Sequence, residues 1–221
     1  MLLAGPTALL IFLQPDLGSA TVFVAIWLGL VWVAGAPRRV FTWLAVGGLA
    51  ALPVAWHLLK GYQRDRLLAF INPHADPLGA GYTIIQSTIA IGSGRLWGRG
   101  WLSGTQNQLS FLPERHSDFI FSVIGEEWGF LGCTVVVAAF GVLLVRAIRI
   151  ALETSEPQGR LLAAGIASWV GYQAFVNMGM VMGLLPVVGV PLPLVSYGGS
   201  SMLTLWVALG LLQSIRATDL R

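Results

Sequence analysis

The stretch that decides the fold lies at residues 111–145 and reads FLPERHSDFIFSVIGEEWGFLGCTVVVAAFGVLLV. Its first half contains four of the protein's ten acidic residues. From Asp118 to Val145 the stretch is apolar almost throughout, without alternation of polar and apolar residues. A run of about 20 apolar residues is long enough to cross a bilayer as a helix. We therefore predict a membrane-spanning helix over Asp118–Val145 that begins beside a dense group of charged side chains.

Composition extends this prediction to the whole chain. The 221 residues are 56% hydrophobic and 10% charged, whereas a soluble domain carries about 25% charged residues. Such a chain cannot cover its surface with polar groups, so the bilayer must be its solvent, and apolar runs without alternation favour helices over barrel strands. The net charge of +3 is spread along the chain, and no basic tract suggests nucleic-acid binding. The single cysteine, Cys133, cannot form a disulfide framework.

Further apolar segments complete the predicted helices. The other full spans are Asp16–Gly35, Val40–Leu59, Leu161–Met182 and Ser200–Ile215. Met1–Leu13 would be only about 20 Å long against a hydrocarbon core of about 30 Å, so it is expected to be the end of a longer helix. We predict an all-α, polytopic membrane helix bundle, with five full helices and an N-terminal stub in a single domain over residues 1–221.

Three segments of different character connect these helices. Arg146–Arg160 is predicted as a polar turn, and Gly183–Gly199 as an apolar but irregular segment, because it contains three prolines. Lys60–Ser117 is predicted as a long loop rich in glycine and proline. Within this loop, Tyr82–Ile91 is too short to span the bilayer and is expected to lie in the interface or dip into it.

Alternating helix directions divide the connections between two sides of the membrane. The long loop, Gln14–Gly18 and Gly183–Gly199 fall on one side. The turn at Ala36–Arg39, the segment Arg146–Arg160 and the C-terminal tail fall on the other side. That second side carries seven arginines in short segments, which marks it as cytoplasmic. The extracytoplasmic long loop carries six cations, which either form a solvated surface or bind an anionic ligand.

Asp118 has two possible roles on sequence grounds. Aspartate is a favoured N-cap worth about 1 kcal/mol, so Asp118 could simply cap the helix that follows it. A carboxylate in this position could also act as a general base. Its neighbours Glu114, Arg115 and His116 could adjust its pKa, shuttle a proton or bond within the loop. Glu114 and Asp118 together could hold Mg²⁺ or Mn²⁺, because hard cations prefer oxygen ligands.

Two acidic residues and a glycine-rich loop form further candidates. Glu126 and Glu127 would lie about 12–14 Å from Asp118 on a straight helix. They form either an interfacial pair or functional acids inside the membrane. The loop at residues 92–100 contains Arg95 and Arg99 and could approach a phosphate, although most such loops are only turns.

The two ends of the predicted outer face carry the remaining candidates. Ser196, Gly198, Gly199 and Ser200 surround the start of the last helix, where an anion or a sugar could bind or where the serines could only cap the helix. Asp16, at the outer end of the N-terminal stub, is expected to be a structural polar residue that requires a cation.

Nine motifs in this chain together resemble one known family. They are QPDLG (14–18), GYQRDRL (61–67), NPHADPLGAGY (72–82), QSTIAIGSG (86–94), GTQ (104–106), FLPERHSDFIF (111–121), GEEWG (125–129), NMGM (177–180) and LPVVGVPLPLVSYGGS (185–200). The pattern is similar to that of the shape, elongation, division and sporulation (SEDS) family, and closer to its RodA-type elongation members than to its division members. Family members have about ten helices, so the chain resembles their C-terminal portion without about four N-terminal helices.

The resemblance implies a peptidoglycan glycosyltransferase of the bacterial inner membrane. Such an enzyme polymerises lipid II into glycan strands on the extracytoplasmic face during elongation and rod-shape maintenance. The family's catalytic acidic residue falls on Asp118, and the implied partners are a class B penicillin-binding protein and the elongation machinery. The family more often has glycine at position 95 and lysine at position 99, so Arg95 and Arg99 depart from its pattern. Two other functions are consistent with the sequence: a lipid II flippase, and a non-catalytic scaffold that binds a penicillin-binding protein.

Overall fold

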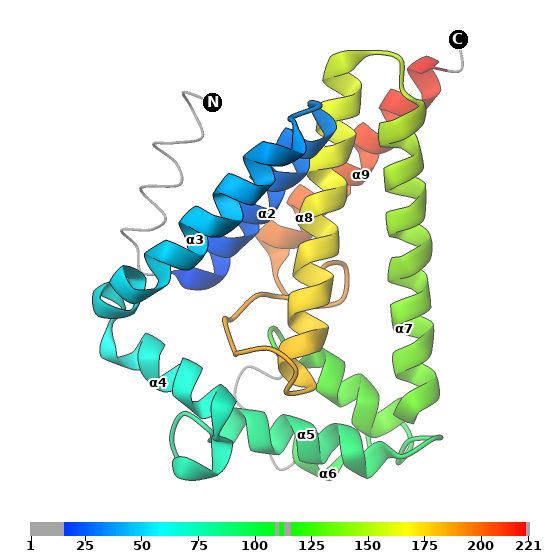
Figure 1. Ribbon diagram of the computed structural model, residues 1–221. Coiled ribbons are helices and arrows are strands. Elements are labelled where there is room, and N and C mark those ends of the chain that lie inside the picture. Colours follow the sequence, from blue (N-terminus) through cyan, green and yellow to red (C-terminus); the bar gives the residue numbers. More distant parts are fainter. Residues whose placement is uncertain (1–15, 109–110, 113–115, 220–221) are drawn as a thin grey trace.

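The computed structural model describes residues 16–108, 111–112 and 116–219, and within them it is all-helical (Figure 1). The elements are α2 (Leu17–Val33), α3 (Arg38–Leu58), α4 (Gly61–Ile71), the 3₁₀ helix η1 (Pro73–Ala75), α5 (Tyr82–Gly94), α6 (Thr105–Gln108), α7 (Ile120–Glu153), α8 (Pro157–Val181) and α9 (Gly199–Asp219). Each of the five predicted full spans overlaps one long helix over most of its length, which confirms the predicted fold class. The stub predicted at Met1–Leu13 lies outside the described residues.

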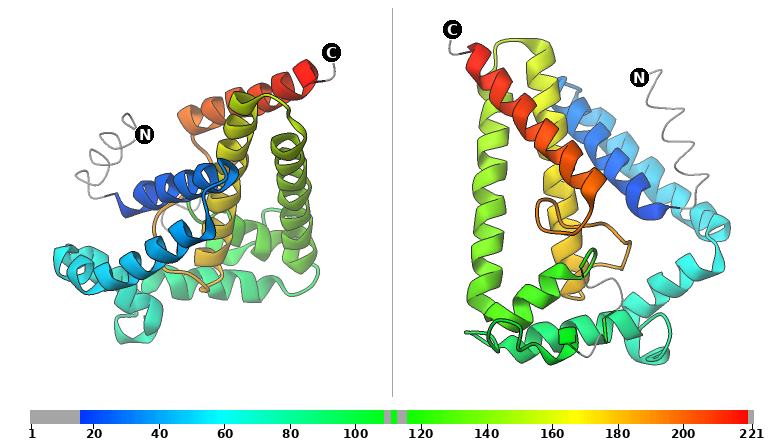
Figure 2. Two further views of the ribbon diagram at one scale, coloured as in Figure 1. Left: turned by 45° about the horizontal axis from the view of Figure 1, so that its top comes forward. Right: turned by 180° about the vertical axis from the view of Figure 1, so that it is seen from behind.

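Helix α8 forms the centre of the bundle. Its buried face consists mainly of small residues, Ala163, Ala164, Ala167, Val170 and Ala174. Small side chains allow helices to approach one another closely within a membrane. Helices α2 and α7 pack against α8, and α9 crosses the bundle on the far side in Figure 1, in front of α7 and α8 in the right-hand view of Figure 2.

Length and composition make this a multi-pass membrane protein. Among the described helices, α3, α7 and α8 are each long and apolar enough to cross a bilayer, and α2 is a shorter apolar helix. Helix α3 contains no buried residue, so its apolar surface faces away from the described bundle. In an aqueous protein such exposure would be costly, but it suits a helix surrounded by lipid or by other membrane helices.

The connections lie at two opposite ends of the bundle, as the alternation of helix directions predicts. Helices α4, α5 and α6 and the start of α7 lie at one end in Figure 1. The α2–α3 turn, the α7–α8 turn and the end of α9 lie at the other end. The irregular segment between α8 and α9 begins at the end that carries α4–α6, where α8 ends, and leads back into the bundle to the start of α9.

Two predicted boundaries are wrong. The segment Lys60–Ser117 is not mainly loop, because α4, α5 and α6 lie within it and α5 includes the predicted interfacial run Tyr82–Ile91. The polar turn predicted at Arg146–Arg160 is much shorter, since α7 continues to Glu153 and α8 begins at Pro157. Arginine has a high helix propensity, and the isoleucines near Arg146 and Arg149 continue the apolar pattern of α7. The charged residues therefore do not end this helix. Proline at the first position of α8 then suits a helix start.

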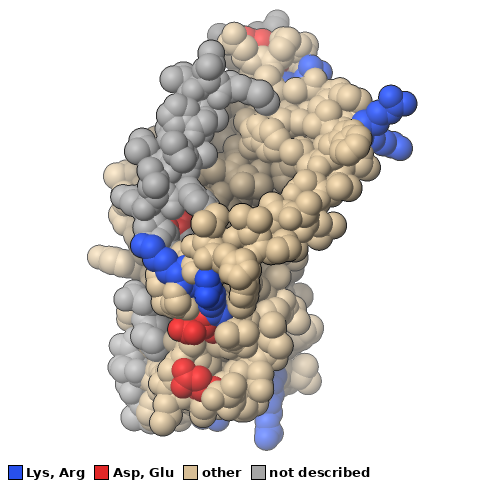
Figure 3. Space-filling model, turned by 60° about the vertical axis from the view of Figure 1, so that its left-hand side comes forward, with Lys and Arg blue, Asp and Glu red and all other residues tan. Residues whose placement is uncertain are grey.

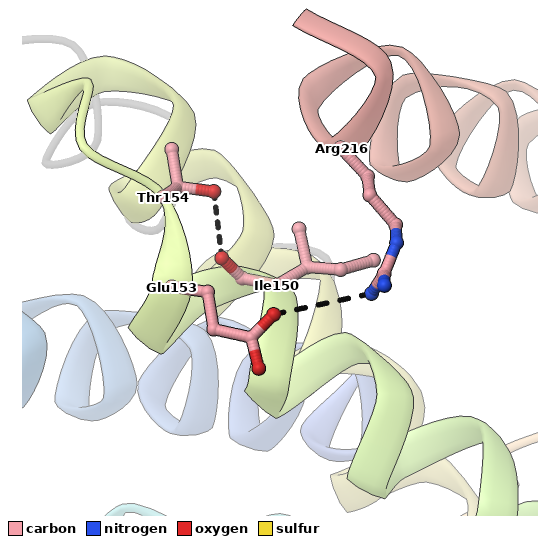
Figure 4. Close-up of polar contacts among 4 residues, drawn as sticks. All are labelled: Ile150, Glu153, Thr154 and Arg216. Carbon is pink, nitrogen blue, oxygen red and sulfur yellow. Dashed lines mark hydrogen bonds and ion pairs between the residues drawn. The ribbon is translucent and has the colours of Figure 1, made fainter. Parts of the chain in front are cut away.

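Polar contacts join the α7–α8 turn to the end of α9. The Thr154 hydroxyl donates to the Ile150 carbonyl at 2.6 Å, and Arg216 lies 4.0 Å from Glu153 (Figure 4). The Ser155 hydroxyl donates to the Asp219 carboxylate at 3.0 Å. The Glu153–Arg216 pair is exposed to solvent, so it contributes at most about 1 kcal/mol. The contacts of Arg216 and Asp219 hold the end of α9 at the end of the bundle remote from Asp118, whereas the Thr154–Ile150 bond lies within the end of α7.

Candidate active site

Asp118 lies in a turn that precedes α7. The turn covers residues 116–119, and α7 begins at Ile120 with Phe119 as its N-cap. The Phe119 side chain makes no capping hydrogen bond. The helix-capping role considered for Asp118 is therefore wrong, because the helix begins one residue later than a cap at Asp118 would require. The carboxylate is half-buried and is directed by the turn rather than by the helix.

A cavity of about 450 Å³ contains Asp118 and is lined by residues from five parts of the chain. Its lining comprises Tyr62, Asp65 and Arg66 of α4, Gly79 and Ala80 of the following turn, Thr83 and Ile84 of α5, Asp118 and Phe119, and Val187 and Gly189 of the segment between α8 and α9. A cavity of this size accommodates a small-molecule group such as a sugar. In Figure 3, basic and acidic side chains gather on an otherwise largely uncharged face. The site thus combines a carboxylate, a guanidinium and a phenol in one concave region.

Three consecutive backbone carbonyls hold the Asp118 turn to the rest of the bundle. The His116 carbonyl accepts from the Tyr197 backbone N–H at 2.8 Å. The Ser117 carbonyl accepts from the Ser196 hydroxyl, and the Asp118 carbonyl accepts from the Asn177 side-chain amide at 2.8 Å. These donors come from α8 and from the irregular segment before α9. The position of Asp118 is therefore fixed through its main chain by distant parts of the sequence.

Helix α7 is interrupted at Gly129, in the third turn of the helix. Gly129 has φ 67° and ψ −161°, a conformation open almost only to glycine. The loop after α5 pairs with the backbone on both sides of the break. Arg99 and Gly100 donate their N–H groups to the carbonyls of Glu126 and Glu127 at 2.9 and 3.0 Å, and the N–H groups of Phe130 and Leu131 donate to the carbonyls of Arg95 and Leu96 at 2.8 and 3.3 Å.

This pairing explains how a long helix tolerates a sharp break. In a continuous helix the Phe130 N–H would bond to the Glu126 carbonyl, and the Leu131 N–H to the Glu127 carbonyl. The loop supplies replacement partners for all four groups, so none is left unsatisfied in an apolar environment. The close approach requires glycine: a Cβ on Gly98 would lie 2.1 Å from the Glu127 carbonyl oxygen. The glycine-rich loop therefore has a structural role.

Glu126 and Glu127 are both buried beside this break, with 0% and 6% of their surfaces exposed. The Glu126 carboxylate accepts from the Gln106 backbone N–H at 3.0 Å and from the Thr105 hydroxyl at 3.3 Å. Arg99 in turn donates to the Thr105 hydroxyl at 2.9 Å. Both acids are therefore enclosed by protein, and Glu126 anchors α6 to α7.

The remaining predicted site residues fall into three groups. Glu114 and Arg115 lie outside the described residues, so the predicted metal pair of Glu114 and Asp118 cannot be placed. His116 is exposed and adjoins Asp118 through the turn. Arg95 and Arg99 are exposed at the α7 break and do not line the Asp118 cavity.

The candidates at the start of the last helix are separated by the structure. Ser196 is buried and lies three residues before α9, where its hydroxyl contacts Leu192 and Ser117, so it does not cap that helix. Gly199 begins α9, next to Gly198, and Ser200 is exposed in its first turn. Asp16 is the N-cap of α2 and accepts from the Ser19 N–H at 3.1 Å, so a backbone donor takes the place of the expected cation.

Sequence reasoning did not single out Tyr62, Arg66 or Asn177 as site residues. Tyr62 and Arg66 lie in the GYQRDRL motif, and Asn177 begins the NMGM motif. Membership of these motifs was the signal that could have identified them. Their distance from Asp118 along the chain, 59 residues for Asn177, hid their proximity in space. In the described residues no group of three His, Cys, Asp or Glu side chains is arranged to hold a metal ion.

The fold and the site define a polytopic helical membrane protein with a carboxylate-bearing cavity at one end of its bundle. A family model described as a cell cycle protein, covering FtsW, RodA and SpoVE, matches residues 2–220. The chain therefore belongs to the FtsW/RodA/SpoVE family, which confirms the SEDS resemblance.

Relatives and solved structures agree with this assignment. The peptidoglycan glycosyltransferase MrdB of Escherichia coli K12 is 47% identical over 208 residues, covering 94% of this chain and 56% of MrdB. Stage V sporulation protein E of Bacillus subtilis is 42% identical over 207 residues, with 94% and 56% covered. The chain thus spans little more than half the length of these relatives.

Two solved structures share the fold. A peptidoglycan synthase complex that coordinates polymerization and crosslinking matches with a TM-score of 0.81 and 36% identity, over 98% of this chain and 60% of the matched chain. The crystal structure of Thermus thermophilus RodA, a rod shape determining protein, matches with a TM-score of 0.61 and 34% identity, over 96% of this chain and 52% of RodA.

Proposed function

We propose that this chain carries the catalytic carboxylate of a peptidoglycan glycosyltransferase that polymerises lipid II during cell elongation and rod-shape maintenance. The observation that carries the proposal is the cavity in which Asp118 lies together with Arg66 and Tyr62. The naming of E. coli MrdB, 47% identical to this chain, as a peptidoglycan glycosyltransferase supports the same activity.

Asp118 acts as the general base. The 4-hydroxyl of one lipid II sugar attacks the anomeric carbon of another lipid-linked sugar or of the growing strand. Asp118 takes the hydroxyl proton as the new carbon–oxygen bond forms, and the bond to undecaprenyl pyrophosphate breaks with its electron pair leaving on the pyrophosphate. Direct displacement inverts the anomeric centre and needs no second carboxylate as nucleophile. A positioned base contributes about 10²–10⁴-fold to such a reaction.

Arg66 and Tyr62 bind the leaving group. A guanidinium offers several donors in a fixed plane that matches phosphate oxygens, and the tyrosine hydroxyl can add a further donor. Arg64, only two residues away, has a structural role, because its guanidinium donates to the carbonyls of Trp56 and His57 at 3.0 and 2.9 Å. Two neighbouring arginines on α4 are thereby divided between structure and ligand binding.

A divalent cation fits the same cavity. Asp65 and Asp118 both line it, and carboxylate oxygens are the ligands that Mg²⁺ and Mn²⁺ prefer. Such an ion commonly takes one or two carboxylates and completes its coordination with phosphate oxygens and water. When bound, it would neutralise charge on the pyrophosphate.

The cavity faces the extracytoplasmic side of the bacterial inner membrane. Six arginines toward the opposite end, Arg38, Arg39, Arg146, Arg149, Arg160 and Arg216, support this orientation. The partner is a class B penicillin-binding protein of the elongation machinery, since the similar synthase complex couples polymerization with crosslinking. Lipid II and the growing glycan strand are the substrates.

The test replaces Asp118 with asparagine in protein reconstituted into lipid vesicles with lipid II. We expect glycan polymerisation to fall by at least 10²-fold, while Asp219→Asn, at the opposite end of the bundle, polymerises like the unaltered protein. Transbilayer movement of lipid II is measured in the same vesicles, and its loss without loss of polymerisation would support a flippase. Full polymerisation by the Asp118→Asn variant would refute the assignment.

A parallel measurement addresses the scaffold alternative. The 221-residue chain and full-length E. coli MrdB are compared in the same vesicles with a class B penicillin-binding protein. Polymerisation by both supports a complete catalytic site in this chain. Polymerisation by MrdB alone would show that this chain does not carry the activity by itself, and Asp118→Asn would then be tested at the matching position of the longer relative.

A further inference from the structure

The Asp118 turn is held by a feature that its own helix does not provide. The N-cap residue of α7, Phe119, makes no side-chain capping bond. Its three successive carbonyls instead receive donors from Tyr197, Ser196 and Asn177. The Ser196 and Asn177 donors lie 79 and 59 residues further along the chain. The conformation of the turn is therefore decided by tertiary contacts.

Both hydrogen bonds of the Asn177 side chain are donated by its amide nitrogen. It is completely buried on α8, and its amide nitrogen donates to the carbonyls of Asp118 and Val190 at 2.8 and 2.7 Å. Its amide oxygen has no hydrogen-bond partner among the described residues. Burying an unpaired polar atom costs about 1–3 kcal/mol. An apolar residue would avoid that cost, so the two donated bonds are what the asparagine provides.

Ser196, in the irregular segment before α9, also donates a side-chain hydrogen bond to the Asp118 turn. It is 4% exposed, and its hydroxyl accepts from the Leu192 N–H at 2.7 Å while it donates to the Ser117 carbonyl. The same atom therefore closes a turn in the irregular segment and ties that turn to the residue before Asp118. Val190, the second acceptor of Asn177, lies in the same segment.

We propose that Asn177 and Ser196 are positioning residues that orient the Asp118 carboxylate by holding the main chain of residues 116–118. We call this set of three carbonyls and their donors the carbonyl clamp. The proposal gives Ser196 and Tyr197 of the VSYGGS motif a role in this clamp. It rests on the proposed function only in that Asp118 is taken as the base, because the clamp itself is a feature of the fold.

The structural arm of the test measures hydrogen exchange at the clamp. The variants are Asn177→Asp, which keeps the shape of the side chain but has at most one donor in place of two, and Ser196→Ala. The matched control is Ser87→Ala, since Ser87 is equally buried but donates only within its own helix, to the Ile84 carbonyl at 3.0 Å. We expect the Tyr197 amide and the amides of residues 116–119 to exchange at least tenfold faster in both clamp variants, and at the unaltered rate in Ser87→Ala.

The kinetic arm separates positioning from general stability. In both clamp variants we expect kcat to fall at least tenfold, KM for lipid II to stay within threefold, and the acidic limb of the pH–rate profile to move. Ser196→Thr restores the hydroxyl, and a cavity of about 30 Å³ that Ser196 lines gives its methyl group room. We expect this variant to recover most of the rate.

The outcomes distinguish failure of the clamp from failure of the proposed function. Unchanged exchange at Tyr197 and residues 116–119 in both clamp variants overturns the proposal, as does equal acceleration in Ser87→Ala. If Asn177→Asp does not fold, Ser196→Ala and Ser196→Thr decide the matter. If the Asp118→Asn variant still polymerises lipid II, the assignment of Asp118 as the general base is wrong. The hydrogen-exchange result would still test the clamp.

Discussion

Replacing Gly129 with alanine tests how the break in α7 is maintained. Gly129 has φ 67° and ψ −161°, and a side chain in such a region costs about 1–3 kcal/mol. The new Cβ would also lie 2.3 Å from the Gly98 nitrogen and 2.8 Å from the Leu96 carbonyl carbon. Both neighbours are backbone atoms, so no side-chain rotation can relieve the contact, and the loop must move away from the helix.

Movement of the loop at residues 95–100 destabilises the Gly129→Ala variant further. The loop makes four backbone hydrogen bonds across the break, each worth about 0.5–1.5 kcal/mol. Loss of half of them, added to the strain, predicts that Gly129→Ala lowers the free energy of unfolding by about 2–6 kcal/mol. The matched control is Gly141→Ala on the same helix, where a Cβ meets nothing within 4 Å. That change is expected to be neutral or to stabilise by about 0.5–1 kcal/mol, because alanine favours helix.

The assay is thermal and denaturant unfolding of the two purified variants in one detergent. Tryptophan fluorescence adds a local signal, because Trp101 in the loop and Trp128 beside the break make an edge-to-face contact with ring centroids 5.7 Å apart. We expect Gly129→Ala to change this emission as well as to lower stability. Equal stability of Gly129→Ala and Gly141→Ala would refute the explanation that strain and loop contacts maintain the break.

Three further substitutions and one chelation experiment test other parts of the structure. Arg95 has φ 51° and ψ −140°, so Arg95→Gly is expected to raise the free energy of unfolding by about 1 kcal/mol; lower stability in a denaturant titration would contradict this. Arg66→Ala is expected to raise KM for lipid II roughly tenfold or more, since a charge-assisted hydrogen bond is worth about 1.5–3 kcal/mol. Arg64→Ala should leave KM unchanged and lower the thermal midpoint, and equal KM values for the two variants would exclude the leaving-group role. Chelation by EDTA is expected to slow polymerisation, with recovery on adding Mg²⁺; a rate insensitive to both would exclude the divalent cation.

The sequence predicted the long helices well because they depend on local apolar runs. It also predicted which connections share one end of the bundle, because successive helices alternate in direction. Long apolar runs produced α2, α3, α7, α8 and α9 close to their expected positions, and alternation of direction placed α4–α6 opposite the α7–α8 turn. The end of α7 was misjudged because Arg146 and Arg149 interrupt an apolar pattern without interrupting a helix. Composition alone cannot separate a polar turn from the polar last turns of a helix.

The candidate site was predicted only in part, because it is assembled across the fold. Asp118 was identified through its motif, but its cavity partner Arg66 lies on a helix within the segment predicted as loop. Arg99 was considered as a phosphate ligand, whereas its backbone and side chain serve the α7 break. No periodicity predicts that Asn177 meets the Asp118 carbonyl, since that contact depends on how α8 packs beside the irregular segment.

The break at Gly129 makes the shape of α7 a property of two segments of chain. A peptide covering α7 alone would lack the four partners that the loop provides, and its own carbonyl and N–H groups would pair into a straight helix. The orientation of the Asp118 end of α7 relative to the rest of that helix therefore depends partly on residues 95–100. An insertion or a proteolytic cut in that short loop would therefore change the orientation of the first turns of α7, beside Asp118, without any change in the sequence of α7.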